Sequence, residues 1–142
     1  MKITDFMNTI GIDRFDAENW RRRVGLKTDY APTVAGRAQG YSRENVLELA
    51  LVGAFVDSGA HPPTAVAYAD MVRRNEALRL RRWLVFPAGN CSTAAGTNDL
   101  EAGAIERCAK ESPTGTVVVI DLHAIIAKVD GLFAQAIEGQ AG

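Results

Sequence analysis

The sequence has few of the residues that metal centres, disulfide frameworks and membrane spans require. Its 142 residues include only two cysteines and two histidines. Sixteen residues separate Cys91 from Cys108, a spacing that matches no zinc-site pattern and needs no disulfide in a reducing compartment. No run approaches the roughly 18 apolar residues of a transmembrane helix, and the N-terminus carries Asp5 with no apolar signal-peptide core behind it. We therefore expect a cytoplasmic protein with no metal, no cofactor and no membrane contact.

A strong excess of charge of either sign is also missing, because the net charge is only −1. The distribution is nevertheless uneven. Residues 1–82 hold 13 Lys and Arg against 10 Asp and Glu, whereas residues 83–142 hold 3 against 7. The hydrophobic content of 47% indicates a globular protein. If the protein binds a polyanion, the first of these two segments is the one that would approach it.

The first segment has the pattern of two helices joined by a tight turn. Large apolar residues recur at i, i+3, i+4 and i+7, the spacing of an amphipathic helix, at Ile3, Phe6, Met7 and Ile10. Gly11, Ile12 and Asp13 then supply a helix stop, a buried anchor and a cap for the next helix. That second helix is predicted over residues 14–24. Within it, residues 19–23 read Asn-Trp-Arg-Arg-Arg, so its guanidinium groups cannot all point inward.

The segment from Lys27 to Gly40 has no helical periodicity and is rich in turn residues. We predict that it forms a two-stranded wing. Ser42 is a good N-cap for a strongly apolar helix, and Pro62-Pro63 begins another. This order predicts a winged helix-turn-helix head on residues 1–78.

The remainder predicts a small module of the order β-α-β-α on residues 83–138. Trp83 to Phe86 reads as a strand, 88–98 as a loop, a short helix follows around Ala104, and Thr116 to Ile120 reads as a second strand. Asp121 would cap a last helix with heptad-like apolar spacing. So thin a core favours pairing with a second copy, and we expect a homodimer. The candidate dimerisation residues are Val118, Ile120, Leu122, Ile126, Val129 and Phe133. The overall expectation is an α+β fold with a head and an α/β dimerisation module.

Three motifs resemble a known family when they are taken together. They are Gly11-Ile12-Asp13, Arg23-Val24-Gly25-Leu26 and Tyr41-Ser42-Arg43-Glu44-Asn45-Val46. The resemblance is to the mercury-resistance regulator (MerR-type) superfamily of winged helix-turn-helix proteins, over residues 1 to about 75. It implies a bacterial transcriptional regulator that binds double-stranded DNA as a dimer. The interval from Gly11 to Leu26 is one residue longer than the usual family pattern.

Candidate contacts to DNA follow from the chemistry of the side chains. Arginine can grip a phosphate or read guanine, and Asn19 is a candidate for reading adenine. Side chains on and beside the wing would hold phosphates. The candidate DNA-binding residues are Arg14, Asn19, Arg21, Arg22, Arg23, Lys27, Tyr30, Arg37 and Arg43. The alternative for the Arg21–Arg23 run is a solvated helix face. For Arg79, Arg81 and Arg82, a solvated linker and a second phosphate patch are equally supported.

Enzymatic and metal-binding functions have less support. His61 lies at a turn, and His123 has no ligand spacing relative to the two cysteines. No phosphate-binding glycine motif and no pair of catalytic carboxylates is recognisable, so we do not expect an enzyme. The segment from Pro87 to Ser92 could accept a small ligand or simply form a surface loop. A small-molecule effector is possible but has no motif behind it.

Two other classes of function fit the same sequence. The spacing from Trp20 to Gly25 also resembles the heads of phage excisionases and small terminase subunits, which would make this an architectural DNA-binding protein. The other alternative is a protein-interaction module. In that case replacing Arg21–Arg23 would leave activity intact, whereas Ile126→Asp with Phe133→Asp would abolish it.

Overall fold

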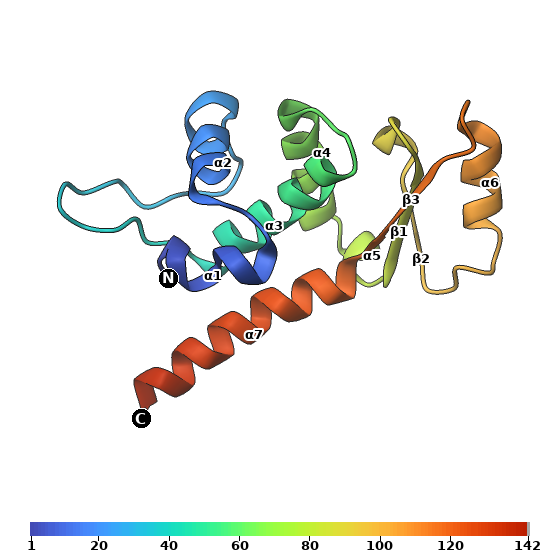
Figure 1. The fold of residues 1–142 in the computed structure, drawn as a ribbon. Helices are drawn as coiled ribbons and strands as arrows, with labels where there is room; N and C mark the ends of the chain where they lie inside the picture. The colour runs from blue at the N-terminus through green and yellow to red at the C-terminus, as the bar shows by residue number, and fades with distance from the viewer. Residues whose placement is uncertain (142) are drawn as a thin grey trace.

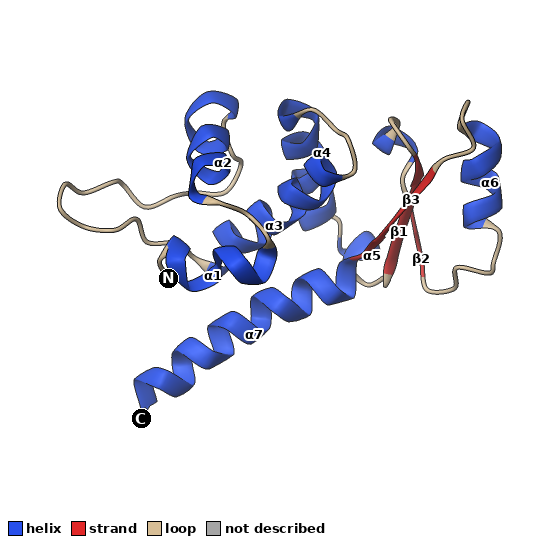
Figure 2. Cartoon of the chain, viewed as in Figure 1, coloured by secondary structure: helices blue, strands red, loops and turns tan. Residues whose placement is uncertain are grey.

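The computed structural model describes the backbone of residues 1–141 and the side chains of residues 1–135. Helices form one end of the molecule and a small sheet forms the other, with a long C-terminal helix running beneath the helical end (Figure 1; Figure 2). This mixed structure confirms the predicted α+β class. The elements are α1 (Ile3–Ile10), α2 (Arg14–Asn19), the π-helical turn η1 (Trp20–Val24), α3 (Arg43–Asp57), α4 (Pro62–Arg74), α5 (Glu76–Arg79), β1 (Trp83–Pro87), the 3-10 turn η2 (Cys91–Thr93), β2 (Ala95–Thr97), α6 (Ala104–Glu111), β3 (Val117–Asp121) and α7 (Leu122–Ala141).

The first two helices begin and end where the sequence predicts. Gly11 terminates α1 in the left-handed conformation, with a φ of 68° that favours glycine. The Asp13 carboxylate accepts a hydrogen bond of 2.8 Å from the backbone N–H of Asp16 and so caps α2. Together α2 and η1 cover residues 14–24, the range predicted for the second helix.

The end of this helix widens into a π-helical turn. The backbone N–H of Gly25 donates to the carbonyl of Trp20 at 2.9 Å, a bond that spans five residues instead of four. Such a turn accommodates one extra residue without breaking the helix. The helix can therefore hold one additional residue before it ends at Gly25.

The predicted two-stranded wing is wrong, because residues 25–42 contain no strand and form a long loop (Figure 1). The loop is closed by side chains in place of a ladder. The Gln39 amide donates to the carbonyl of Ala31 at 2.6 Å, and the Thr33 hydroxyl donates to the Gln39 amide oxygen at 2.9 Å. Pro32 has no N–H to offer a partner strand. Residues 31–38 are all exposed, so no apolar face holds two strands together.

The helix α3 lies at the centre of the fold. Its N-terminus is fixed by a reciprocal cap, in which Ser42 N donates to Asn45 Oδ1 at 2.9 Å and Asn45 N donates to Ser42 Oγ at 3.1 Å. It packs most extensively against α4 and α7. The continuous apolar sequence of this helix is therefore explained by burial on several sides.

The sheet has the order β2-β1-β3 and is antiparallel throughout. Leu84 and Phe86 face the helical end, where Phe86 stacks on Phe55 of α3 with ring centroids 5.9 Å apart. The helix α6 packs against β1 and β3. The predicted loop over 88–98 is thus wrong in part, because β2 lies within it. Ala95-Gly96-Thr97 lacks the alternating apolar pattern of a strand and is ordered by its pairing with β1.

The last helix connects the two ends of the molecule. Asp121 caps α7 by accepting a hydrogen bond from Ala124 N at 3.1 Å, as predicted. The helix then packs across α3 and α1, and Arg43 Nε lies 2.6 Å from Asp130 Oδ1. One hydrophobic core consequently runs from Phe6 to Leu132. Among the described residues, no helix combines the length and the apolar character needed to cross a lipid bilayer.

Candidate nucleic-acid interface

The inward side of the α2–η1 helix is fixed in the core. Ala17 and Trp20 retain only 2% and 4% of their surface. On the facing helix α3, a Cβ atom at Gly53 would lie 2.9 Å from Ile12 Cδ1 and 4.0 Å from Trp20 Cη2. The absence of a side chain at Gly53 therefore lets the turn and the helix approach α3 closely. This packing confirms that Trp20 points inward and fixes which side of the helix faces solvent.

The opposite side of the helix carries Phe15, Asn19 and Arg22, which are all exposed. Their spacing of i, i+4 and i+7 makes them a single ridge. Arg23 is also exposed, whereas Arg21 is half-buried near Tyr41. The ridge therefore presents an aromatic ring, an amide and a guanidinium group, which are chemically suited to the edges of base pairs.

Charge is distributed unevenly along this helix. Its N-terminal half carries Asp13, Asp16 and Glu18, with Arg14 Nε 3.3 Å from Glu18 Oε1. Partial burial and the charge of Asp13 raise the pKa of the Asp16 carboxyl. The charged side chains of the last turn, Arg21–Arg23, are all basic, and the negative end of the helix dipole favours cations there. A polyanion would thus be attracted to the C-terminal end of the helix.

Ion pairs divide the arginines of the described residues into two groups. Five have a carboxylate oxygen within 4.0 Å, and these are Arg14, Arg43, Arg73, Arg74 and Arg82. The other group has no such partner among the described residues, and it consists of Arg21, Arg22, Arg23, Arg37, Arg79, Arg81 and Arg107. An arginine without an internal carboxylate keeps its charge available for an external anion.

The start of the loop after η1 is held by a buried carboxylate, Glu48 of α3. Its oxygens accept hydrogen bonds from the backbone N–H groups of Lys27 and Thr28, at 2.5 and 3.1 Å, and from the hydroxyls of Thr28 and Tyr30, at 2.6 and 3.0 Å. The Asn45 amide adds bonds to Thr28 Oγ1 and to the carbonyl of Asp29. This network fixes the position at which the chain leaves η1. The position of the loop therefore depends on its hydrogen bonds to α3.

Two of the candidate phosphate contacts are occupied inside the protein. The Tyr30 hydroxyl donates to Glu48, and burial together with the Glu48 charge raises the pKa of Tyr30 well above its usual value. Arg43 pairs with Glu44 and Asp130. By contrast, the side chains of Lys27 and Arg37 are exposed. The structure therefore leaves Lys27 and Arg37 as the free cations of the loop.

The candidate dimerisation residues lie mainly inside the chain. Ile120, Leu122 and Val129 retain 8%, 1% and 0% of their surface, so they are used by the core of a single copy. The other three, Val118, Ile126 and Phe133, are half-buried and pack against that core. An interface built from these candidates would have to use the three that remain partly exposed, Val118, Ile126 and Phe133.

Phe15 is the residue of this surface that the sequence analysis missed. It is 86% exposed, more than any other large apolar side chain among the described residues. A signal was present, because Phe15 lies on the opposite side of the helix from Ala17 and Trp20 when positions are projected at 100° per residue. Its position on the polar side of the predicted helix could therefore have been recognised from the sequence.

The cysteines and histidines do not form a second site. Cys91 and Cys108 are both buried thiols, and burial raises the pKa of Cys91. His61 and Cys91 line a cavity of about 120 Å³ between the α3–α4 turn and the loop after β1. In the described part of the chain, no three His, Cys, Asp or Glu side chains are grouped so that they could hold a metal ion.

The last turn of the α2–η1 helix and the following loop thus form an outward-facing basic surface at the helical end. Its inner side is fixed by Ala17 and Trp20, and four of its arginines, Arg21, Arg22, Arg23 and Arg37, have no carboxylate partner among the described residues. No protein-family model and no curated protein matches this chain.

Proposed function

We propose that the protein is a sequence-specific, DNA-binding transcriptional regulator of the cytoplasm, with residues 1–78 as its DNA-binding head. One observation carries the proposal. Arg21–Arg23 have no carboxylate partner among the described residues, and they end a helix whose other side is locked into the core by Ala17 and Trp20. A helix fixed on one side and basic on the other is the element that helix-turn-helix proteins place in the major groove.

In this account the ridge of Phe15, Asn19 and Arg22 faces the base edges. Arg22 would read guanine, Asn19 would read adenine, and the Phe15 ring would contact a thymine methyl group. Arg23 would hold a phosphate. The loop after η1 replaces a wing, and Lys27 and Arg37 contact the flanking backbone.

We further propose that two copies bind together, which would set two recognition helices in successive major grooves about 34–36 Å apart. The half-buried side chains of α7, Ile126 and Phe133, are the candidates for this contact that the core leaves partly accessible. Analytical sedimentation at micromolar concentration tests this part by itself. A monomer at that concentration would exclude it.

Equilibrium binding to a labelled DNA duplex tests the main proposal. We expect Arg22→Ala with Arg23→Ala to weaken binding by at least about tenfold, since two contacts to the nucleic acid are lost. Arg107→Ala is the matched control, because Arg107 is also exposed and without a carboxylate partner among the described residues but lies on α6. Equal affinities for all three proteins would contradict the proposal.

A further inference from the structure

The segment from Arg73 to Arg82 joins the helical end to the sheet and carries five arginines and one acidic residue, Glu76. These arginines fall into two groups, those with a carboxylate partner and those without one among the described residues. Arg73 and Arg74 bind Asp70 at 2.8 and 3.1 Å. Arg79 and Arg81 are exposed and have no carboxylate within 4.0 Å among the described residues.

Arg82 has a structural role, because its side chain and its backbone N–H both contact groups within the protein. Its guanidinium lies 4.3 Å from the centroid of the Trp83 ring and 3.3 Å from Asp121 Oδ2, which ties the start of β1 to the end of β3. Its backbone N–H donates to Asn98 Oδ1 at 2.9 Å. Arg82 is therefore the structural arginine of this segment, whereas its neighbour Arg81 is not.

The stem of Arg81 is positioned by β2. A Cβ atom at Gly96 would lie 3.0 Å from Arg81 Cγ and 3.2 Å from Leu78 Cδ2, so the aliphatic stem of Arg81 packs on the glycine. The guanidinium group remains at the surface. Because its stem is already packed, the side chain loses less conformational entropy when it binds a partner. Arg79 ends the short helix α5, and Leu80 between them is 66% exposed.

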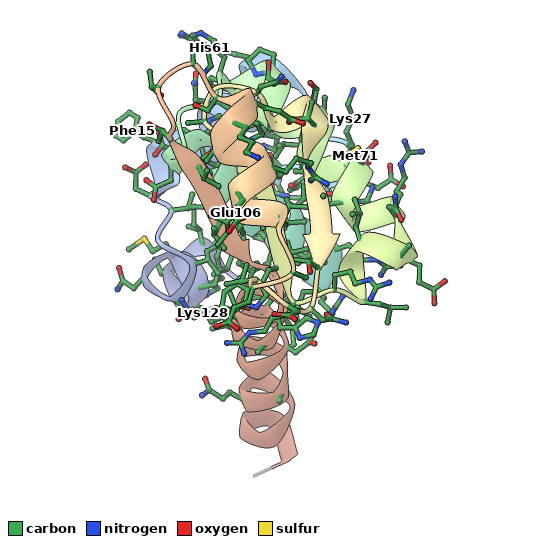
Figure 3. All side chains as sticks on the ribbon, turned by 90° about the vertical axis from the view of Figure 1, so that its right-hand side faces the viewer. Phe15, Lys27, His61, Met71, Glu106 and Lys128 are labelled. Carbon is green, nitrogen blue, oxygen red and sulfur yellow. The ribbon has the colours of Figure 1, made fainter. Side chains whose placement is uncertain are left out.

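This basic surface is connected to the recognition helix through α4. The helix α4 contacts η1 and leads directly to α5, and its 13 residues span about 20 Å. In Figure 3, Lys27, which follows η1, and Met71, near the end of α4, are labelled on one side of the molecule, and Phe15 is labelled on the opposite side.

We propose that Arg79 and Arg81 form a second phosphate-binding surface, which contacts the backbone of the same DNA duplex outside the site of the recognition helix. The inference rests on the proposed function. It assigns the basic segment to DNA positioning, with no role in reading sequence. An exposed arginine pair with no internal carboxylate is complementary to a phosphodiester backbone, and the contact would add affinity to every sequence equally.

The test compares binding to a core duplex and to the same duplex lengthened by about ten base pairs, one helical turn, at each end. The variant is Arg79→Gln with Arg81→Gln, and the matched controls are Arg79→Lys with Arg81→Lys and the remote Arg107→Gln. We expect the Gln variant to bind the core duplex like the wild type and to lose the extra affinity for the long duplex. The slope of log K against log salt on the long duplex should fall in magnitude by about 2. The Lys variant should keep most of that slope.

The possible results separate this inference from the proposed function. Wild-type affinity and slope in the Gln variant would overturn the second surface while leaving the head intact. A loss of affinity in the Gln variant, combined with no effect of Arg22→Ala with Arg23→Ala, would support the surface and overturn the role of the head. No binding of either duplex by the wild type would overturn both.

Discussion

The hydroxyl of Tyr30 donates a 3.0 Å hydrogen bond to the carboxylate of Glu48, and so joins the loop after η1 to the buried centre of α3. The two residues are 18 positions apart in the chain. Through this contact and the neighbouring bonds to Lys27 and Thr28, the position of the exposed loop depends on a residue that no ligand would touch.

Replacing Glu48 should destabilise the protein. In Glu48→Ala, the backbone N–H groups of Lys27 and Thr28 lose their acceptor in a partly buried setting. We expect the free energy of unfolding to fall by about 3 kcal/mol, measured by chemical denaturation. Glu44→Ala is the control, because Glu44 is exposed and its ion pairs contribute little. Equal losses in the two variants would contradict the anchoring role.

Ionisation of the Tyr30 hydroxyl should lower the free energy of unfolding in strong alkali. The pKa of Tyr30 is raised above its usual 10.0, first by burial and then by the Glu48 charge. Its contribution to stability is therefore complete below pH 10 and is lost as the pH rises above that value, because the unfolded chain ionises first. Absorbance of the phenolate during alkaline titration checks this. Tyr30→Phe should remove the latest-ionising component, and an unchanged titration would contradict the assignment.

Two helical glycines should respond in opposite ways to alanine. Gly131 in α7 has open space where a Cβ would lie, so Gly131→Ala should stabilise the protein by about 0.5–1 kcal/mol. Gly53 has the same helical setting, but a Cβ there would meet Ile12 at 2.9 Å. We expect Gly53→Ala to cost about 1 kcal/mol net, since overpacking outweighs the gain in helix propensity. Denaturant midpoints measured side by side test this, and stabilisation by both changes would refute the close packing of the turn on α3.

Phe15 should matter for binding and not for stability. At 86% exposure it contributes little to the core, so Phe15→Ala should change the free energy of unfolding by less than about 0.5 kcal/mol. On a selected DNA site we expect affinity to fall about tenfold, with discrimination lost at a thymine. Unchanged affinity and base preference would remove Phe15 from the recognition ridge.

Much of the fold could be predicted from local patterns. The period of the apolar residues, the glycine stop at Gly11 and the carboxylate caps at Asp13 and Asp121 predicted three helices with their starting points. The wing was predicted wrongly because turn residues do not show whether the segments between them pair as β-strands. The strand β2 was missed because its order comes from pairing with β1, a contact that is remote in the sequence.

The candidate site was predictable only as a set of residue types. The sequence shows twelve arginines, but not which of them meet a carboxylate across the fold. Arg43 was counted as a phosphate contact, yet its partner Asp130 lies 87 residues away. Leu122 and Val129 were counted as an interface because their heptad-like spacing is the same whether the helix packs on a second copy or on α1 and α3 of its own chain.

The central claim is that the α2–η1 helix reads a DNA sequence. Selection of bound fragments from a random DNA pool at near-physiological salt tests it most directly, with the wild type and the Arg22→Ala/Arg23→Ala variant run in parallel. The account predicts that the wild type enriches one inverted-repeat site and that the variant does not. Salt-sensitive binding without enrichment of any site, or the same enrichment by both proteins, would contradict it.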